Sequence, residues 1–197
     1  MSHDALIEEY LAGPGLLRRA VAGMTSDQLL ARPIPGKWST QEVVCHLADY
    51  EPIYADRMKR VIALKEPELL KGDPELFAAR LAYDHRDVEE ELALIELTRK
   101  QMGRILRALK PEDFQRQGGH SRDGVLTLEV LLQRITAHIP HHVRFIEEKR
   151  RAMACAASFS GTEGRGLQSA CWITADCSSR TIGPKRWPRR WWLWRWD

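Results

Sequence analysis

The chain has 197 residues, with 30 Lys and Arg against 27 Asp and Glu, which suits one domain and a short further segment. Residues 1–150 hold 22 basic and 24 acidic residues, whereas residues 151–197 hold 8 and 3, so the tail alone is strongly basic. No apolar run of about 18 residues and no secretion signal occur, and Cys45 is the single cysteine before residue 151. We therefore expect no membrane span, no internal disulfide in residues 1–150 and a cytoplasmic location.

The first half of the chain follows a helical pattern. The spacing of apolar residues predicts a helix over 5–22, interrupted or kinked at residues 13–15 (Gly-Pro-Gly). Residues 25–28 match a capping box that opens a short helical turn, and residues 39–42 match a second one. The second box begins a long helix whose apolar positions are Val43, Leu47, Tyr50, Tyr54, Met58, Val61 and Ile62.

The second half predicts two further long helices after a long connection over residues 65–83. Asp84 and Asp87 favour a helix start by capping, and the apolar pattern continues to Leu109. Thr127 is the predicted N-cap of the last helix. Residues 1–150 show no alternating strand pattern of useful length, so the fold class is all-α, a four-helix bundle.

Histidines occupy core positions of this last helix. The apolar rhythm of Leu131 and Ile135 continues through His138 and His142, which are spaced i, i+4 and therefore share one face. His46 lies on the apolar side of the second long helix. Imidazole suits zinc, nickel and iron, and three protein ligands with an open position are typical of a reactive metal centre.

Other interpretations of these histidines stay open. Each could be a surface or hydrogen-bonded core residue, and spacing alone does not connect His46 to the later pair. His141 is three residues after His138 and could replace His142, although it breaks the apolar rhythm. Pro140 leaves the Thr136 carbonyl without its usual helical donor and is expected to kink the helix.

Two carboxylates lie about one turn from His46. Glu42 and Asp49 are candidates to accept a hydrogen bond from a ligand imidazole and so orient it. Glu42 already has a role in the capping box, and Asp49 could equally belong to a solvated helix face. Cys45 points about 100° away from His46 and is interpreted as a small core residue.

Residues 37–51 (KWSTQEVVCHLADYE) and 138–150 (HIPHHVRFIEEKR) resemble the DinB-like superfamily of metal-binding four-helix bundles, and the resemblance covers roughly residues 5–153. The resemblance implies an up-down-down-up bundle with a crossover between the second and third helices, and frequent dimers. It also implies that His46, His138 and His142 hold one divalent metal. Relatives in this family include transferases and isomerases that use a low-molecular-weight thiol as co-substrate, so a metal-dependent thiol transferase or hydrolase acting on a small molecule is implied.

Residues 154–197 depart from the family pattern. The segment is irregular, and residues 184–197 contain five tryptophans among basic residues and prolines, without an amphipathic period. We interpret it as a non-selected extension, such as a frameshifted or read-through end, beyond a domain of residues 1–153. The alternative is a cationic tail for an anionic membrane or a nucleic acid, partners not expected for the bundle itself. A non-catalytic metal-binding protein of the stress response is the remaining alternative.

Overall fold

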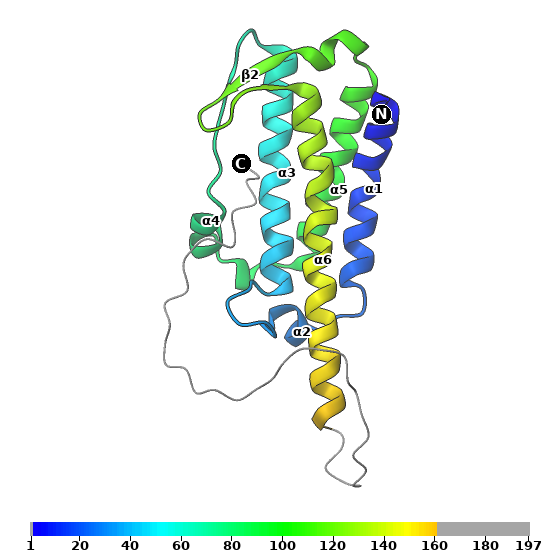
Figure 1. Ribbon diagram of the computed structural model, residues 1–197, viewed down its shortest axis with the longest axis vertical. Coiled ribbons are helices and arrows are strands. Elements are labelled where there is room, and N and C mark those ends of the chain that lie inside the picture. The colour runs from blue at the N-terminus through cyan, green and yellow to red at the C-terminus, as the bar shows by residue number, and fades with distance from the viewer. Residues whose placement is uncertain (1, 161–197) are drawn as a thin grey trace, which may run out of the picture.

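The computed structural model describes residues 2–160, and four long helices form its main body (Figure 1). They are α1 (His3–Val21), α3 (Thr40–Ala63), α5 (Val88–Arg107) and α6 (Leu128–Ser160). In Figure 1, α1 and α6 run downwards while α3 and α5 run upwards. The chain between α3 and α5 crosses back along the outside of the bundle. The predicted up-down-down-up bundle with its crossover is confirmed.

Shorter elements fill the connections. They are α2 (Ser26–Leu30), β1 (Glu68–Leu69), α4 (Pro74–Arg80), η1 (Tyr83–His85), η2 (Pro111–Gln115), β2 (Gln117–His120) and β3 (Gly124–Thr127). The strands form one small sheet, in which β2 pairs parallel with β1 and antiparallel with β3. Strands of two to four residues are too short to produce a readable alternation, which is why the sequence did not predict them.

Both predicted capping boxes are present. Ser39 Oγ accepts a hydrogen bond from the Glu42 amide at 3.1 Å, and the Glu42 carboxylate accepts one from the Ser39 amide at 2.6 Å. Thr25 and Gln28 make the same reciprocal pair at the start of α2. These bonds satisfy amides that a helix start leaves without intrahelical acceptors, and they fix where α3 begins.

A fully buried ion pair lies in the middle of the bundle. Arg99 on α5 and Glu51 on α3 are both 0% exposed, and the guanidinium donates to Glu51 Oε1 at 2.5 and 2.8 Å. The same guanidinium donates to the carbonyls of Tyr10 on α1 (2.6 Å) and Ile135 on α6 (2.8 Å). Pro14 has no N–H to give the Tyr10 carbonyl, so Arg99 replaces the missing helical donor. One side chain thus connects all four long helices.

Pro14 and Pro140 lie inside continuous helices, so the chain is not interrupted at residues 13–15. The stretch around Pro14 lies within the single helix α1, and Pro140 lies within the single helix α6. On α1, the hydrogen bond from Arg99 compensates for the lost donor. On α6, Arg99 bonds the Ile135 carbonyl, in the turn before Pro140.

Gly13 is required by this arrangement. A Cβ atom at Gly13 would lie 2.2 Å from Arg99 Nη1, and the buried guanidinium has no room to withdraw. Gly13→Ala is therefore expected to destabilise the protein by about 1–3 kcal/mol through overpacking. Gly15→Ala is the matched control in the same helix, because its Cβ would meet only Arg19 Nη1 at 3.5 Å. That variant should gain about 0.5–1 kcal/mol from helix propensity. Urea unfolding measures both, and equal effects would contradict the packing argument.

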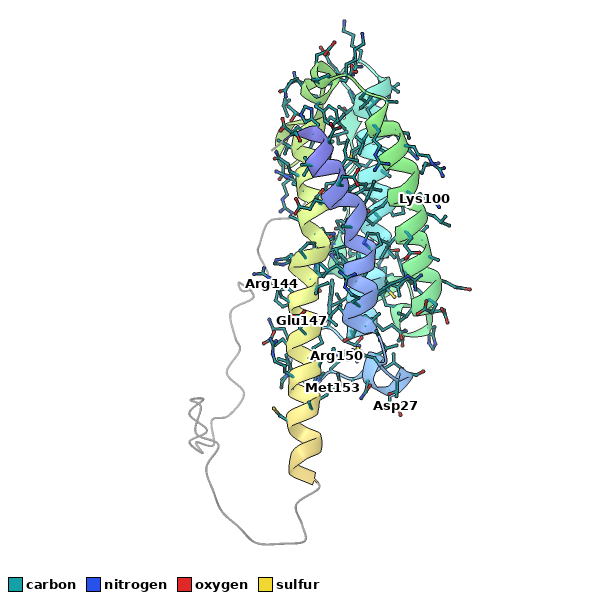
Figure 2. All side chains as sticks on the ribbon, turned by 90° about the vertical axis from the view of Figure 1, so that its right-hand side faces the viewer. Asp27, Lys100, Arg144, Glu147, Arg150 and Met153 are labelled. Atoms are coloured by element: carbon teal, nitrogen blue, oxygen red, sulfur yellow. The ribbon has the colours of Figure 1, made fainter. Side chains whose placement is uncertain are left out.

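The last helix continues to Ser160, seven residues past the predicted domain end at residue 153. Figure 2 shows α6 continuing past Arg150 and Met153, below the other helices of the bundle. Arg150 donates to the carbonyls of Ala20 and Ala22 at the end of α1. The tryptophan-rich part of the predicted extension, residues 161–197, lies outside the described residues. Within residues 2–160 we find no helix with the length and apolar character needed to span a membrane.

Candidate metal centre

Three histidines from two helices converge between α3 and α6. His46, His138 and His142 each offer a ring nitrogen, and these nitrogens lie within 4.8 Å of one another. The ring centroids are 5.0, 4.9 and 4.8 Å apart, with the rings turned edge to face. His46 and His138 are 5% and 4% exposed, and His142 is half-buried. The structure brings together the three residues that the sequence singled out.

The bundle places these rings by packing two apolar faces. One buried cluster includes Tyr50 of α3 and Ile135 of α6, and a second includes Leu47 of α3 and Ile139 of α6. His138 falls between the two clusters on α6, and His46 falls one residue before Leu47. The spacing i, i+4 then adds His142 one turn further along α6.

The nitrogen atoms fit a shared cation. His46 Nε2 and His138 Nε2 face each other at 3.1 Å, and Nδ1 of each of the three rings is buried without a hydrogen-bond partner among the described residues. Two nitrogens that each lie about 2.0–2.1 Å from one ion are separated by roughly 3.0–3.4 Å. Buried imidazole nitrogens without partners are costly. The donor set therefore suits a first-row divalent metal, which takes imidazole readily.

Burial keeps the rings neutral, which is the form that binds a metal. Removal from water lowers the pKa of His46 to about 3, with a smaller contribution from His141. Burial also holds the pKa values of His138 and His142 well below the usual range, and the neighbouring histidines add to both effects. At pH 7 each lone pair is available, since a neutral imidazole has one unprotonated nitrogen.

Aromatic side chains flank the His46 ring. Trp38 lies 5.2 Å from it and Tyr50 lies 4.6 Å from it, measured between ring centroids. Tyr50 also lies 5.7 Å from His138 and 6.3 Å from Phe77 on α4. Because His142 is the most exposed of the three histidines, the approach from solvent is on its side. Sequence reasoning did not assign Trp38 to this site, because it precedes the helix and has no periodic neighbour.

His141 stays outside the cluster, as its break of the apolar rhythm predicted. Its Nδ1 lies 3.0 Å from Arg144 Nη2, and its ring lies 5.0 Å from Phe145. The three histidines whose ring nitrogens lie within 4.8 Å of one another include His142 and not His141. Position on the helix face therefore separates two adjacent histidines.

The two predicted carboxylate partners are engaged elsewhere. Asp49 accepts from the Tyr83 hydroxyl at 2.7 Å and from Arg86 at 2.9 Å, which ties the crossover to α3. Glu42 accepts from its own cap and from Arg32 at 2.8 Å. No hydrogen bond of the described residues joins either carboxylate to a histidine ring, so the predicted orienting contact is absent from this structure. The sequence did not predict the contact of Arg86 with Asp49, because Arg86 lies in the crossover between α3 and α5, where the apolar pattern predicted only a connection.

Cys45 is a buried core residue, as expected. Its side chain is 0% exposed, and its Sγ lies 3.6 Å from the Tyr83 carbonyl. Burial raises the pKa of the thiol to about 12, so it is protonated at neutral pH and unsuited to act as a nucleophile.

Fold and site together define a class: a four-helix bundle with an unusual crossover and three converging histidines between two of its helices. The family model of the DinB superfamily matches residues 9–146, so the chain belongs to the DinB superfamily. This agrees with the resemblance in the motifs around His46 and His138.

Named relatives are similar in sequence and structure. The chain is 29% identical over 134 residues to "Putative metal-dependent hydrolase OB0782" of Oceanobacillus iheyensis, covering 68% of this chain and 77% of the relative. It is 29% identical over 151 residues to "Putative metal-dependent hydrolase YfiT" of Bacillus subtilis, covering 76% and 85%. The solved structure of the Bacillus subtilis protein superposes with a TM-score of 0.73 at 28% identity, covering 78% of this chain and 90% of that one. Its title describes "a probable metal-dependent hydrolase with an unusual four-helix bundle topology".

Proposed function

We propose that this protein is a metal-dependent hydrolase that binds one divalent transition metal through His46, His138 and His142. The observation that carries the proposal is the convergence of three neutral imidazoles, two buried and one half-buried, whose nitrogens lie within 4.8 Å of one another. Structural zinc sites usually have four protein ligands, whereas three leave a position open for chemistry. The names of the relatives from Oceanobacillus and Bacillus support the same reaction class.

The chain's own residues would hold and shield the reacting group. A divalent ion held by neutral imidazoles lowers the pKa of water from about 15.7 to about 7 and so supplies a nucleophile at neutral pH. Trp38 and Tyr50 cover the His46 ring and limit access of bulk water to that side. His142, the least buried of the three histidines, leaves its own side for a small-molecule substrate.

A thiol co-substrate is the second nucleophile that this centre would serve. Among the described residues no carboxylate hydrogen-bonds to the three rings, so no side chain stands ready as a general base. A thiol, with an ordinary pKa of about 8.5, needs less help than water to become an anion. Thiol transfer to an electrophile is therefore the variant of the proposal to test beside hydrolysis.

Reconstitution with single metals tests these proposals. Metal-free protein is reloaded with zinc, nickel or ferrous iron and assayed for hydrolysis of model esters and for transfer of small thiols to electrophiles. We expect turnover that depends on the metal, that falls by at least about 100-fold in His46→Ala, and that persists in His141→Ala. Thiol consumption without hydrolysis would assign the transferase. Metal binding without either reaction would leave a non-catalytic metal-binding protein and overturn the proposal.

A further inference from the structure

The crossover between α3 and α5 is anchored to the bundle at two points. At the first point, the buried Arg57 of α3 donates from Nε and Nη2 to the Leu70 carbonyl at 2.9 and 2.6 Å. At the second point, the Tyr83 hydroxyl donates to Asp49 at 2.7 Å, and the Tyr83 carbonyl accepts from Gln41 at 2.9 Å. Hydrogen bonds shielded from water in this way hold their two partners firmly.

Residues 71–82, between these two anchors, are attached much less firmly. They contain α4, which has no buried side chain and lies on the outside of the bundle beside α3 (Figure 1). Within residues 2–160, no hydrogen bond or ion pair joins residues 71–82 to any of the four long helices. The Asp73 side chain instead caps α4 itself by accepting from the Leu76 amide at 3.1 Å. A segment with so few buried contacts opens at a low cost in free energy.

Two packing contacts of residues 71–82 are made with Tyr50 of α3. A Cβ atom at Gly72 would lie 3.0 Å from the Tyr50 hydroxyl oxygen, so the backbone of Gly72 lies against that side chain. The half-buried ring of Phe77 lies 6.3 Å from the Tyr50 ring, measured between centroids. Leu76 and Leu81 are exposed. Phe77 is therefore the large apolar side chain that attaches α4 to the bundle.

Tyr50 connects this segment to the histidine centre. Its ring lies 4.6 Å from the His46 ring and 5.7 Å from the His138 ring, and its side chain is buried. Tyr50 thus has the two histidines on one side and Gly72 with Phe77 on the other. Movement of residues 71–82 away from α3 would uncover Tyr50 and allow its ring to turn away from the histidines.

The backbone at Ala82 is suited to be a hinge. Ala82 has φ 51° and ψ 45°, in the left-handed region, which residues other than glycine seldom adopt. Such a conformation is costly and persists only where the surrounding structure imposes it, and it is frequent in segments that switch between two arrangements. Ala82 directly precedes the Tyr83 anchor, so rotation there would move α4 without disturbing the anchor.

We propose that residues 71–82 form a lid over the Tyr50 side of the histidine centre, hinged next to Leu70 and at Ala82, and that Phe77 controls the size of the substrate admitted there. While the lid is closed, Gly72 and Phe77 keep Tyr50 against the histidine rings and exclude water from that side. While it is open, a substrate bulkier than the His142 side admits can enter. This inference rests on the proposed function and adds a gate to its site.

Nitration of Tyr50 by tetranitromethane in the full chain tests whether the lid opens. The reagent reaches this buried ring only in the open state, so the rate reports the open population. We expect Phe77→Ala to raise the rate of Tyr50 nitration, followed by mass spectrometry of peptides, at least about 10-fold. Leu76→Ala is the matched control, since Leu76 is exposed, and should keep the parent rate. Tyr10, fully buried in the bundle core, should stay unreactive in every variant.

A second pair of variants opens the lid without removing a side chain. The added methyl group of Gly72→Ala would lie within 3.3 Å of atoms of both Tyr50 and Ile53, so it should push the lid away from α3 and also accelerate nitration of Tyr50. Gly119→Ala is its control, because a Cβ atom at Gly119 meets no atom within 4 Å. The metal content should be unchanged in both variants.

Ester hydrolysis by the zinc-loaded chain tests the gate. We expect Phe77→Ala and Gly72→Ala to raise kcat/KM for p-nitrophenyl benzoate relative to p-nitrophenyl acetate at least about 5-fold, and Leu76→Ala to keep the parent ratio. Unchanged Tyr50 nitration, or an equal rise for Tyr10, would overturn the lid. An unchanged ester ratio with faster nitration would overturn the gate. If the zinc-loaded parent hydrolyses neither ester, the proposed function fails, and nitration alone then decides whether residues 71–82 open.

Discussion

His138→Ala should abolish tight metal binding while leaving the bundle folded. Removing one of three imidazoles takes away a ligand outright, and loss of a mere hydrogen-bonding partner of a ligand already costs about 10–100-fold in affinity. We therefore expect the metal content after purification and dialysis to fall from one ion per chain to a small fraction of it. Mass spectrometry of elements measures the content, and circular dichroism confirms that the helices remain.

His141→Ala is the matched control for that experiment. His141 is adjacent to His142 in the chain, but its Nδ1 is in contact with Arg144 and the group of possible ligands does not include it. The metal content of the His141→Ala variant should equal that of the parent protein. A ligand present at 100 times its dissociation constant stabilises the folded state by about 2.7 kcal/mol. The metal-induced rise in Tm should accordingly be kept in His141→Ala and lost in His138→Ala. The same metal content in both variants would show that the site assignment is wrong.

Local pattern was sufficient for the helices and for the pair on α6. A capping box is a contact between residues three apart, so it can be recognised in the sequence and predicts where a helix begins. The pairs Ser39 with Glu42 and Thr25 with Gln28 are the two examples here. The choice of His142 over His141 needed only the helical period. These features depend on short separations along the chain, and the sequence displays such separations directly.

Contacts between distant segments were not readable in the same way. The link from His46 to His138 spans 92 residues and entered through the family resemblance, since no local spacing requires it. Asp49 is a candidate to orient a ring by its spacing from His46, but Arg86, 37 residues later, binds it in the structure. The short strands and the elements of the crossover also depend on contacts between segments far apart in the sequence. The apolar pattern of residues 65–83 therefore predicted only a connection.

Buried charged residues are the other feature that the spacing of apolar residues does not predict. Arg99 and Glu51 occupy helix positions that composition alone would place in solvent, because charged residues are almost never fully buried unless paired. Their pairing, and the need for Gly13 beside them, appear only when the four helices are assembled.

Arg99→Met should strongly destabilise the folded bundle. It leaves the Glu51 carboxylate buried without its cation and removes the donors to the Tyr10 and Ile135 carbonyls. Breaking a buried ion pair by removing one partner costs about 3–5 kcal/mol. Urea unfolding of metal-free protein measures this loss without a contribution from bound metal. Arg107→Met on the same helix is the control, because its ion pair with Glu8 is exposed and should contribute less than about 1 kcal/mol.

The double variant Arg99→Met/Glu51→Met separates the ion pair from the carbonyl contacts. Replacing a whole buried pair by apolar side chains is often neutral, so the double variant should recover part of the stability lost in Arg99→Met. Recovery should be incomplete by about 1–3 kcal/mol, because the Tyr10 carbonyl, four residues before Pro14, remains buried without a donor. Full recovery would mean that Arg99 serves only to neutralise Glu51. No recovery would mean that the hydrogen bonds to α1 and α6 carry the whole effect, and that Pro14 is tolerated because Arg99 replaces the donor that it removes.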